Sequence, residues 1–257
     1  MPRSAQCLPL VLLIVGMSAP AVAGMTDNFN DNSRSGMWAL VEDSHSTLWL
    51  DETNQRLELH AAAPASSSTD ALYLSSGPNG FRVKTDSDFD ISIEYSFTSF
   101  TGSGSIALDL GIGKDLDGKD SAAVAFGRSS GLGDTYLVVA QRVNDAQTTW
   151  PIWPVATAST LHILYNSAGD QLTLRDDGTG YGKVLTGLVQ GTWNADKVWV
   201  SFGGRGDGLT LGSGDAYLDN FSLNGDTVPA PEPATLVLTA VGALGMLLRR
   251  NCRPHAL

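Results

Sequence analysis

The sequence predicts an all-β protein: a two-sheet antiparallel β-sandwich of the jelly-roll type, followed by a single C-terminal hydrophobic helix. Apolar and polar residues alternate with a period of two in about a dozen short segments of the body, and none of these segments has a helical period. Turn-forming residues, with 28 glycines in the chain, separate the segments. The two cysteines, Cys7 and Cys252, lie near the ends, so the body is expected to fold without disulfides.

The clearest strand runs from Phe89 to Phe97. Its odd-numbered positions are aromatic or isoleucine and its even-numbered positions are polar, which is the pattern of a strand with one buried face and one wet face. Residues 161–165 and 171–175 alternate in the same way around a glycine-containing loop and predict a hairpin. Further strands are expected at residues 56–61, 106–112, 122–126, 136–140, 198–202 and 217–223.

The N-terminus indicates export. Arg3, the short apolar run at residues 8–17 and the small residues at 21–23 follow the order of a secretory signal peptide. Residues 1–23 are therefore expected to be removed, and residues 24–227 to form the exported β-sandwich domain. The net charge of −11 at pH 7 argues against nucleic acid as a partner.

The C-terminus carries three signals in a fixed order: Pro231-Glu232-Pro233, an uncharged run at residues 234–248, and then Arg249 and Arg250. This order resembles the PEP-CTERM sorting signal of bacterial surface proteins and assigns it to residues 228–254. The resemblance implies processing by an exosortase-type enzyme after transient anchoring in the inner membrane by a transmembrane helix. An ordinary anchor is the alternative. However, at ~1.5 Å per residue the apolar run reaches only about 22 Å of a ~30 Å hydrocarbon core.

Four stretches of the body resemble the concanavalin A-like lectin/glucanase jelly roll. They are the opening residues 27–31 with Trp38 beyond them, the strand–turn–strand at 48–61, the long strand at 88–97 and the closing strand at 217–223. The resemblance implies the same two-sheet sandwich. It also implies one structural calcium, which in such domains often ties the first and last strands together.

Asp219 and Asp27 are the candidate ligands for that calcium. Asp219 has the same parity as Phe221 and Leu223, so plain alternation points it toward the packed side, where a carboxylate is costly unless it is paired or metal-bound. The opening stretch that contains Asp27 could supply further oxygens, as calcium's ~6–8 ligands require. The alternative is that Asp219 accepts hydrogen bonds from nearby backbone N–H groups.

Trp150 and Trp153 are the candidate carbohydrate-binding residues. Prolines follow both tryptophans in Trp150-Pro151-Ile152-Trp153-Pro154, so the loop is stiff and is kept out of a central strand. Two indoles on such a loop could stack on sugar rings. The alternative is that they close one end of the sandwich, which is the usual role of buried tryptophan.

The sequence predicts no catalytic residues and no enzymatic activity. Glycoside hydrolysis needs two carboxylates across the sugar, and laminarinase-type enzymes carry them as Glu-x-Asp-x-x-Glu on one strand, a motif that does not occur here. Glu94 is expected to be a solvated side chain on the polar face of its strand. Asp115 to Asp120 begins like a calcium loop but has Phe126 where an EF-hand needs glutamate, so a polar turn is expected.

These observations lead to one functional hypothesis with two alternatives. The chain is expected to be an exported, non-catalytic protein of the cell surface or extracellular matrix that binds polysaccharide. The alternatives are a glycan-active hydrolase on the same jelly roll and a purely structural matrix protein without a ligand.

Overall fold

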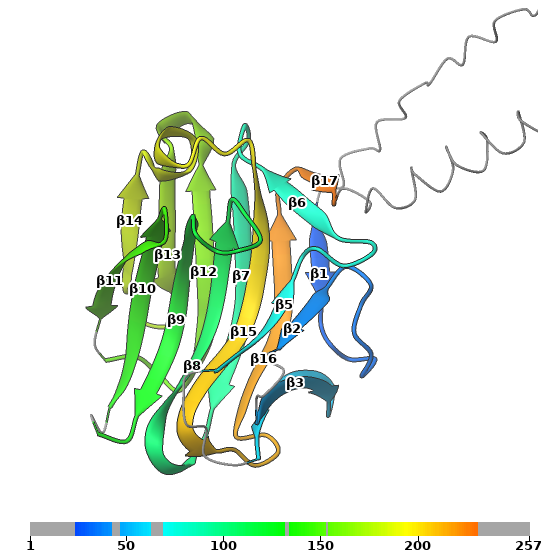
Figure 1. Ribbon diagram of the computed structural model, residues 1–257, viewed down its shortest axis with the longest axis vertical. Helices are drawn as coiled ribbons and strands as arrows, with labels where there is room; N and C mark the ends of the chain where they lie inside the picture. The colour runs from blue at the N-terminus through cyan, green and yellow to red at the C-terminus, as the bar shows by residue number, and fades with distance from the viewer. Residues whose placement is uncertain (1–23, 43–46, 63–68, 132–133, 153, 231–257) are drawn as a thin grey trace, which may run out of the picture.

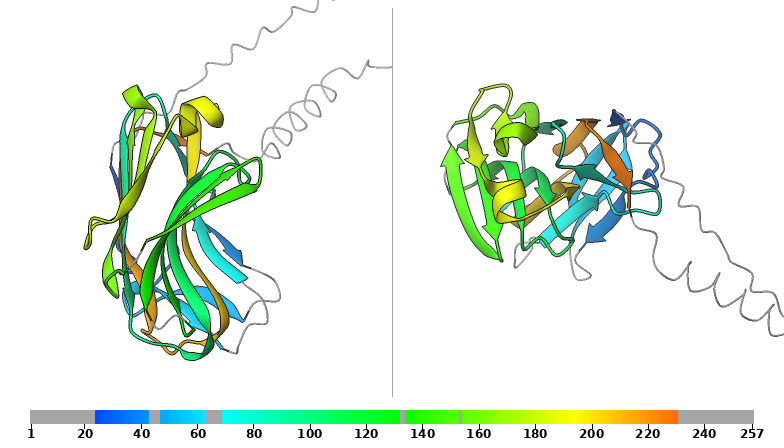
Figure 2. Two further views of the ribbon diagram at one scale, coloured as in Figure 1. Left: turned by 90° about the vertical axis from the view of Figure 1, so that its left-hand side faces the viewer. Right: turned by 90° about the horizontal axis from the view of Figure 1, so that it is seen from above.

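The computed structural model describes residues 24–42, 47–62, 69–131, 134–152 and 154–230. Two antiparallel sheets pack face to face, one in front of the other in Figure 1 and side by side in the left view of Figure 2. The predicted β-sandwich is therefore confirmed. The signal peptide and most of the sorting signal, including the helix expected at 234–248, lie outside the described residues.

We call the two sheets A and B. The order in sheet A is β14 (Gly182–Thr186), β13 (Gln171–Asp176), β12 (Ala158–Asn166), β7 (Phe89–Phe97), β16 (Ala216–Asn224), β4 (Arg56–Ala61) and β3 (Leu48–Thr53), with β1 (Met25–Asp27) also paired to β16. The order in sheet B is β11 (Ala146–Ile152), β10 (Thr135–Val143), β9 (Ser121–Ser129), β8 (Thr101–Gly113), β15 (Lys197–Thr210), β5 (Thr69–Leu74) and β2 (Ala39–Glu42). At one end β6 (Phe81–Lys84) pairs with both β15 and β17 (Thr227–Pro229).

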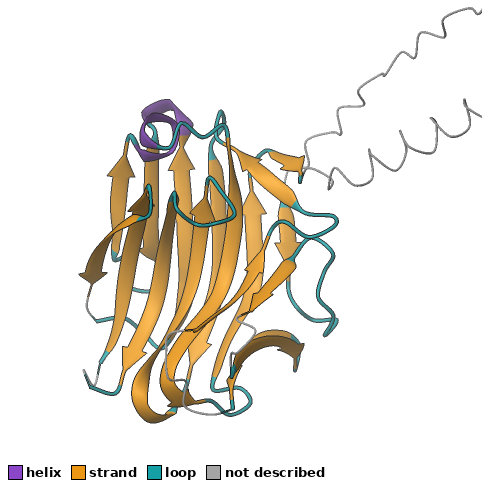
Figure 3. Cartoon of the chain, viewed as in Figure 1, coloured by secondary structure: helices purple, strands orange, loops and turns teal. Residues whose placement is uncertain are grey.

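Two short helical turns interrupt this β architecture, contrary to the expectation of a body without helices (Figure 3). They are the 3-10 turn η1 (Ser167–Gly169) and the π-type turn η2 (Leu188–Thr192). The Asp170 carboxylate holds the start of η2, because it accepts hydrogen bonds from the backbone N–H groups of Val189, Gln190 and Gly191 at 3.1, 3.1 and 2.9 Å. One side chain thus satisfies the free donors at the beginning of the turn.

The core follows directly from the period-two alternation. Along β7 every second residue is buried, and β8, β9 and β15 turn their branched and aromatic residues to the same interior. Trp38 lies in the middle of an aromatic cluster, with ring centroids 4.6 Å from Phe202 and 5.0 Å from Phe221. Its indole Nε1 donates to Asp27 Oδ2 at 2.7 Å, so β1 and the segment before β2 are tied together inside the sandwich.

The domain continues slightly beyond the predicted boundary at residue 227. Val228 and Pro229 pair with β6, and the Ala230 N–H donates to the Gly80 carbonyl oxygen at 2.7 Å. The first residues assigned to the sorting signal are thus attached to the edge of the sandwich. Within the described ranges, no helix has the length and apolarity needed to cross a membrane.

Candidate ligand groove on sheet B

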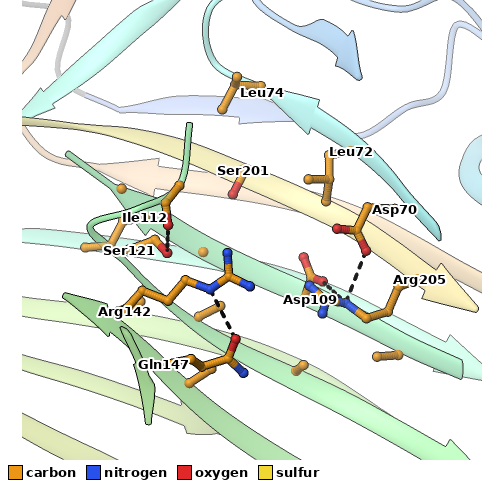
Figure 4. A pocket seen from close by; sticks show the side chains of 18 of the residues that line it. Asp70, Leu72, Leu74, Asp109, Ile112, Ser121, Arg142, Gln147, Ser201 and Arg205 are labelled. Carbon is orange, nitrogen blue, oxygen red and sulfur yellow. Dashed lines mark hydrogen bonds and ion pairs between the residues drawn. The ribbon is translucent and has the colours of Figure 1, made fainter. Parts of the chain in front are cut away.

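The outer face of sheet B is hollowed into a groove of about 440 Å³. Outward-facing side chains from β2, β5, β15, β8, β9, β10 and β11 line it, so the groove crosses all the strands of the main sheet order (Figure 4). It is a property of the whole sheet and is built from segments that lie far apart in the sequence.

The hollow exists because the middle strands turn small residues outward. On β8 and β9 the inward positions carry leucine, isoleucine, valine and phenylalanine at most sites, while the outward ones are almost all alanine or glycine. The small floor residues are Ala107, Gly111, Gly113, Ala123, Ala125, Gly127 and Ala140. The rest of the lining includes larger apolar side chains, Val41, Leu72 and Leu74 on β2 and β5 and Tyr136 and Val138 on β10.

A row of charged side chains crosses the groove floor. Arg205 on β15 lies between two carboxylates, with its Nε 3.3 Å from Asp70 Oδ1 on β5 and 3.9 Å from Asp109 Oδ2 on β8. Figure 4 shows Arg205 reaching both carboxylates. Asp70 stands directly opposite Arg205 in the strand register, whereas Asp109 stands opposite Gly203 and Ala125.

Asp109 is the most deeply placed member of this row. The residue is only 6 % exposed, whereas the side chains of Asp70 and Arg205 are about half exposed. Burial raises the pKa of Asp109 to about 6, with the Arg205 guanidinium opposing the rise and the Asp70 carboxylate adding to it. The carboxyl therefore changes its protonation state near neutral pH.

The structure favours the packing alternative for Trp150. Its partner across the strand pair is Val139, whose side chain is buried, so the indole also faces the sandwich interior, where it packs against the core. Lys183 of β14 covers the ring, with Nζ 5.1 Å from the centroid. Trp150 thus closes the open side between β11 and β14, away from the groove floor. Trp153 lies outside the described residues.

The parity expected for Asp219 is wrong. Asn220 has a positive φ of 49° and forms a bulge, where the register of β16 against β7 shifts between Asp219 and Ser222. The extra residue reverses the alternation. Asp219 therefore lies on the outer face of sheet A, where its Oδ1 accepts the backbone N–H of Asn220 at 2.8 Å.

The two candidate calcium ligands are not arranged as a shared site. The Asp27 carboxylate is engaged by the Trp38 indole and by the backbone N–H of Phe29 at 3.1 Å. In the described part of the chain, no group of three His, Cys, Asp or Glu side chains is placed to hold a metal ion. Asp219 and Asp27 do not fit the calcium site that the resemblance implied, and calcium binding stays an untested prediction.

Two smaller expectations are confirmed. Glu94 is exposed on the outer face of sheet A, where its Oε2 accepts the side-chain amide of Asn220 at 2.9 Å. The segment from Asp115 to Asp120 is a turn between β8 and β9, closed by a hydrogen bond of 2.9 Å from the Lys114 N–H to the Asp120 carbonyl oxygen.

Sequence reasoning missed the groove and its charged row. One signal was present: the outward positions of residues 107–113 and 123–127 are nearly all alanine and glycine, with Asp109 the sole charged residue among them. A strand face that is small along its whole length indicates that something approaches it closely. The partners of Asp109 could not be found in this way, because they come from strands about 40 and 100 residues away.

Comparisons with known proteins define the fold but no family. No protein-family model matches the chain, and none of the curated proteins matches it. Among solved structures, the chain is similar to the CBM2 module of the evolved Dit protein of Lactobacillus casei BL23 phage J-1, with 12 % identity, a TM-score of 0.51, and 80 % of this chain and 99 % of that chain covered.

Two further solved structures, a lectin and an enzyme, show the same likeness at lower scores. The lectin UEA-II complexed with galactose has 12 % identity, a TM-score of 0.47 and coverage of 79 % and 99 %. The GH16 protein of the Bacteroides ovatus mixed-linkage glucan locus, in complex with a product, has 12 % identity, a TM-score of 0.49 and coverage of 77 % and 97 %.

The prediction that the chain is not an enzyme is contradicted by these comparisons. Glycoside hydrolases stand beside lectins among the similar structures. The missing Glu-x-Asp-x-x-Glu motif excludes only one arrangement of carboxylates, and the groove contains another pair, Asp70 and Asp109. At such low identity the likeness describes the fold alone, and the question of catalysis is open.

Proposed function

We propose that the protein is exported and binds polysaccharide in the groove on the outer face of sheet B. The groove itself is the observation that carries this proposal: it crosses seven strands, its floor is made of small residues, and it combines apolar walls with a short polar row. Ligand sites are typically concave, with apolar walls and a few polar groups that fix the orientation of the ligand. An extended groove suits a chain ligand better than a single compact molecule.

The solved structures of similar fold support carbohydrate as the ligand class. They include a CBM2 module, a lectin complexed with galactose and a GH16 protein in complex with a product. The binding proposal rests on the groove of this chain, because one fold can serve many functions.

The proposed location rests on the sequence of the two ends. After removal of residues 1–23, the chain would be anchored transiently in the inner membrane by the run at 234–248 and sorted by an exosortase-type enzyme that recognises Pro231-Glu232-Pro233. It would then reside at the cell surface or in the extracellular matrix. Mass spectrometry of the surface-localised protein tests this, and an intact C-terminus at Leu257 would contradict it.

The binding proposal is tested with a variant that fills the groove. Ala123 lies on the groove floor, and Ala123→Trp should abolish retention of the protein on polysaccharide gels without removing any charge. Thr173→Trp is the matched control, because Thr173 lies on the outer face of sheet A, at the opposite side of the sandwich. The panel comprises mixed-linkage glucan, xyloglucan, polygalacturonate and chitosan. Unchanged retention of Ala123→Trp would refute the groove as the binding site.

Glycan cleavage is the second candidate function, and the pair Asp70 and Asp109 is the observation that favours it. Both carboxylates lie within 4 Å of one guanidinium nitrogen in the groove, and the pKa of Asp109 is raised to about 6 by burial, as is typical of a general acid. Release of reducing ends from the same panel tests this function. Turnover that is lost in Asp109→Asn and in Asp70→Asn would establish it.

A further inference from the structure

Asp109 is a buried carboxyl group without a hydrogen bond. The residue is 6 % exposed and borders the groove, yet within the described part of the chain its carboxylate accepts no hydrogen bond. The nearest cation is Arg205, at 3.9 Å. Its cross-strand neighbours, Gly203 and Ala125, have no polar side chain to offer. Because the carboxylate borders the groove, a molecule bound there can supply the hydrogen-bond donors that the protein does not.

Arg205 beside it has donors to spare. A guanidinium carries five N–H donors, and within the described residues the ion pairs of Arg205 are made by Nε alone, 3.3 Å from Asp70 Oδ1 and 3.9 Å from Asp109 Oδ2. The groove floor therefore presents a carboxylate acceptor next to a guanidinium group with unused N–H donors. A hydroxyl group both donates and accepts, so neighbouring hydroxyls on one sugar ring would satisfy Asp109 and Arg205 together.

The charges of the groove argue for an uncharged sugar. Four carboxylates line the groove, those of Asp70, Asp109, Asp115 and Asp117, against the two guanidinium groups of Arg142 and Arg205, and Arg205 is shared between two of the aspartates. A uronate or sulfate placed on Arg205 would come close to the carboxylates of Asp70 and Asp109, and like charges at such distances repel. A neutral, hydroxyl-rich polysaccharide meets no such repulsion.

We propose that Asp109 is the specificity-determining residue of the groove: its carboxylate accepts hydrogen bonds from the hydroxyls of a neutral sugar unit, while Arg205 donates to a neighbouring hydroxyl. Asp70 is a positioning residue that holds Arg205 in the row. This inference rests on the proposed function, because it names the chemistry by which that groove selects its ligand.

The test measures the affinities of the purified protein for mixed-linkage glucan, polygalacturonate and chitosan at pH 7.5, where Asp109 is ionised. We expect binding to the neutral glucan. Asp109→Ala should weaken it about 10- to 100-fold, the usual effect of losing hydrogen bonds to a charged group. Asp109→Asn should weaken it less than tenfold, because its amide oxygen still accepts. Asp196→Asn is the control, because it removes the same charge at an exposed site outside the groove.

The possible outcomes separate this inference from the proposal on which it rests. If Ala123→Trp abolishes binding while both Asp109 variants bind like the wild type, the groove is the site and the role of Asp109 is refuted. If Asp109→Asn binds as weakly as Asp109→Ala, and the wild type binds chitosan more tightly than the other polysaccharides, then Asp109 recognises a cation and not hydroxyl groups. If Ala123→Trp binds normally, the groove proposal itself fails. Melting temperatures show which variants are folded, and the nearly isosteric Asp109→Asn decides the question if Asp109→Ala does not fold.

Discussion

Replacing Asp109 by asparagine should stabilise the protein at neutral pH. Burial raises the pKa of this carboxyl from 3.8, the ordinary value, to about 6. A difference of one pKa unit corresponds to ~1.4 kcal/mol, so keeping Asp109 ionised in the folded state costs about 3 kcal/mol. The amide of the Asp109→Asn variant cannot ionise and keeps nearly the same shape, so the variant avoids this cost.

The sign of the pH dependence follows from the direction of the shift. Below pH 3.8 the carboxyl is protonated in both the folded and the unfolded protein, and it contributes nothing to the pH dependence. Between pH 3.8 and about 6 only the unfolded state ionises, so the wild type loses stability as the pH rises. Above about pH 6 the full cost is present. The stability difference between Asp109→Asn and the wild type should therefore grow by about 3 kcal/mol from pH 3.5 to pH 7.5.

Urea unfolding followed by tryptophan fluorescence measures this difference, since Trp38 and Trp193 are buried in the folded domain. All other titrating groups are shared by the two proteins and cancel in the comparison. The control Asp196→Asn removes the same charge at an exposed side chain, and its difference from the wild type should stay within about 0.5 kcal/mol over the same pH range. If the Asp109→Asn and wild-type curves run parallel from pH 3.5 to pH 7.5, the reasoning from burial is wrong.

Three further predictions concern carboxylates inside or at the edge of the sandwich. Burial opposes ionisation of Glu58, but hydrogen bonds from four groups outweigh burial and lower the pKa of this carboxyl. Glu58→Ala should therefore lower the free energy of unfolding by roughly 3 kcal/mol in urea at pH 7, and by less as the pH falls below 4.5. Burial raises the pKa of Glu52 and outweighs the hydrogen bond that its Oε1 accepts from the Tyr73 hydroxyl. Glu52→Gln should therefore unfold at a higher urea concentration than the wild type at pH 8, with a smaller gain at pH 4. Asp27→Ala removes the acceptor of the buried Trp38 indole and should cost about 1–3 kcal/mol, whereas a melting temperature equal to that of the wild type would contradict this role.

The sequence by itself determined the strands and their inward faces. Every strand expected from alternation is present, including Phe89 to Phe97 and the hairpin of β12 and β13, because a period of two forces alternate side chains to opposite faces whatever the partner strand is. The alternation predicted the wrong face for Asp219, because a β-bulge interrupts the period of two beside it. Asn220 inserts one residue into β16, and no hydropathy pattern shows that Asp219 has consequently changed sides.

Only the tertiary structure decided which outward-facing side chains lie next to one another on the sheet. The small outward residues of β8 and β9 are visible in the sequence, but the groove that they floor depends on β15 and β5 being placed beside them. Asp70, Asp109 and Arg205 come together because strand order in a sheet differs from chain order, so the register of long-range pairs sets their distances. Strand pairing joins residues across any sequence separation, and a local pattern carries no information about the partner.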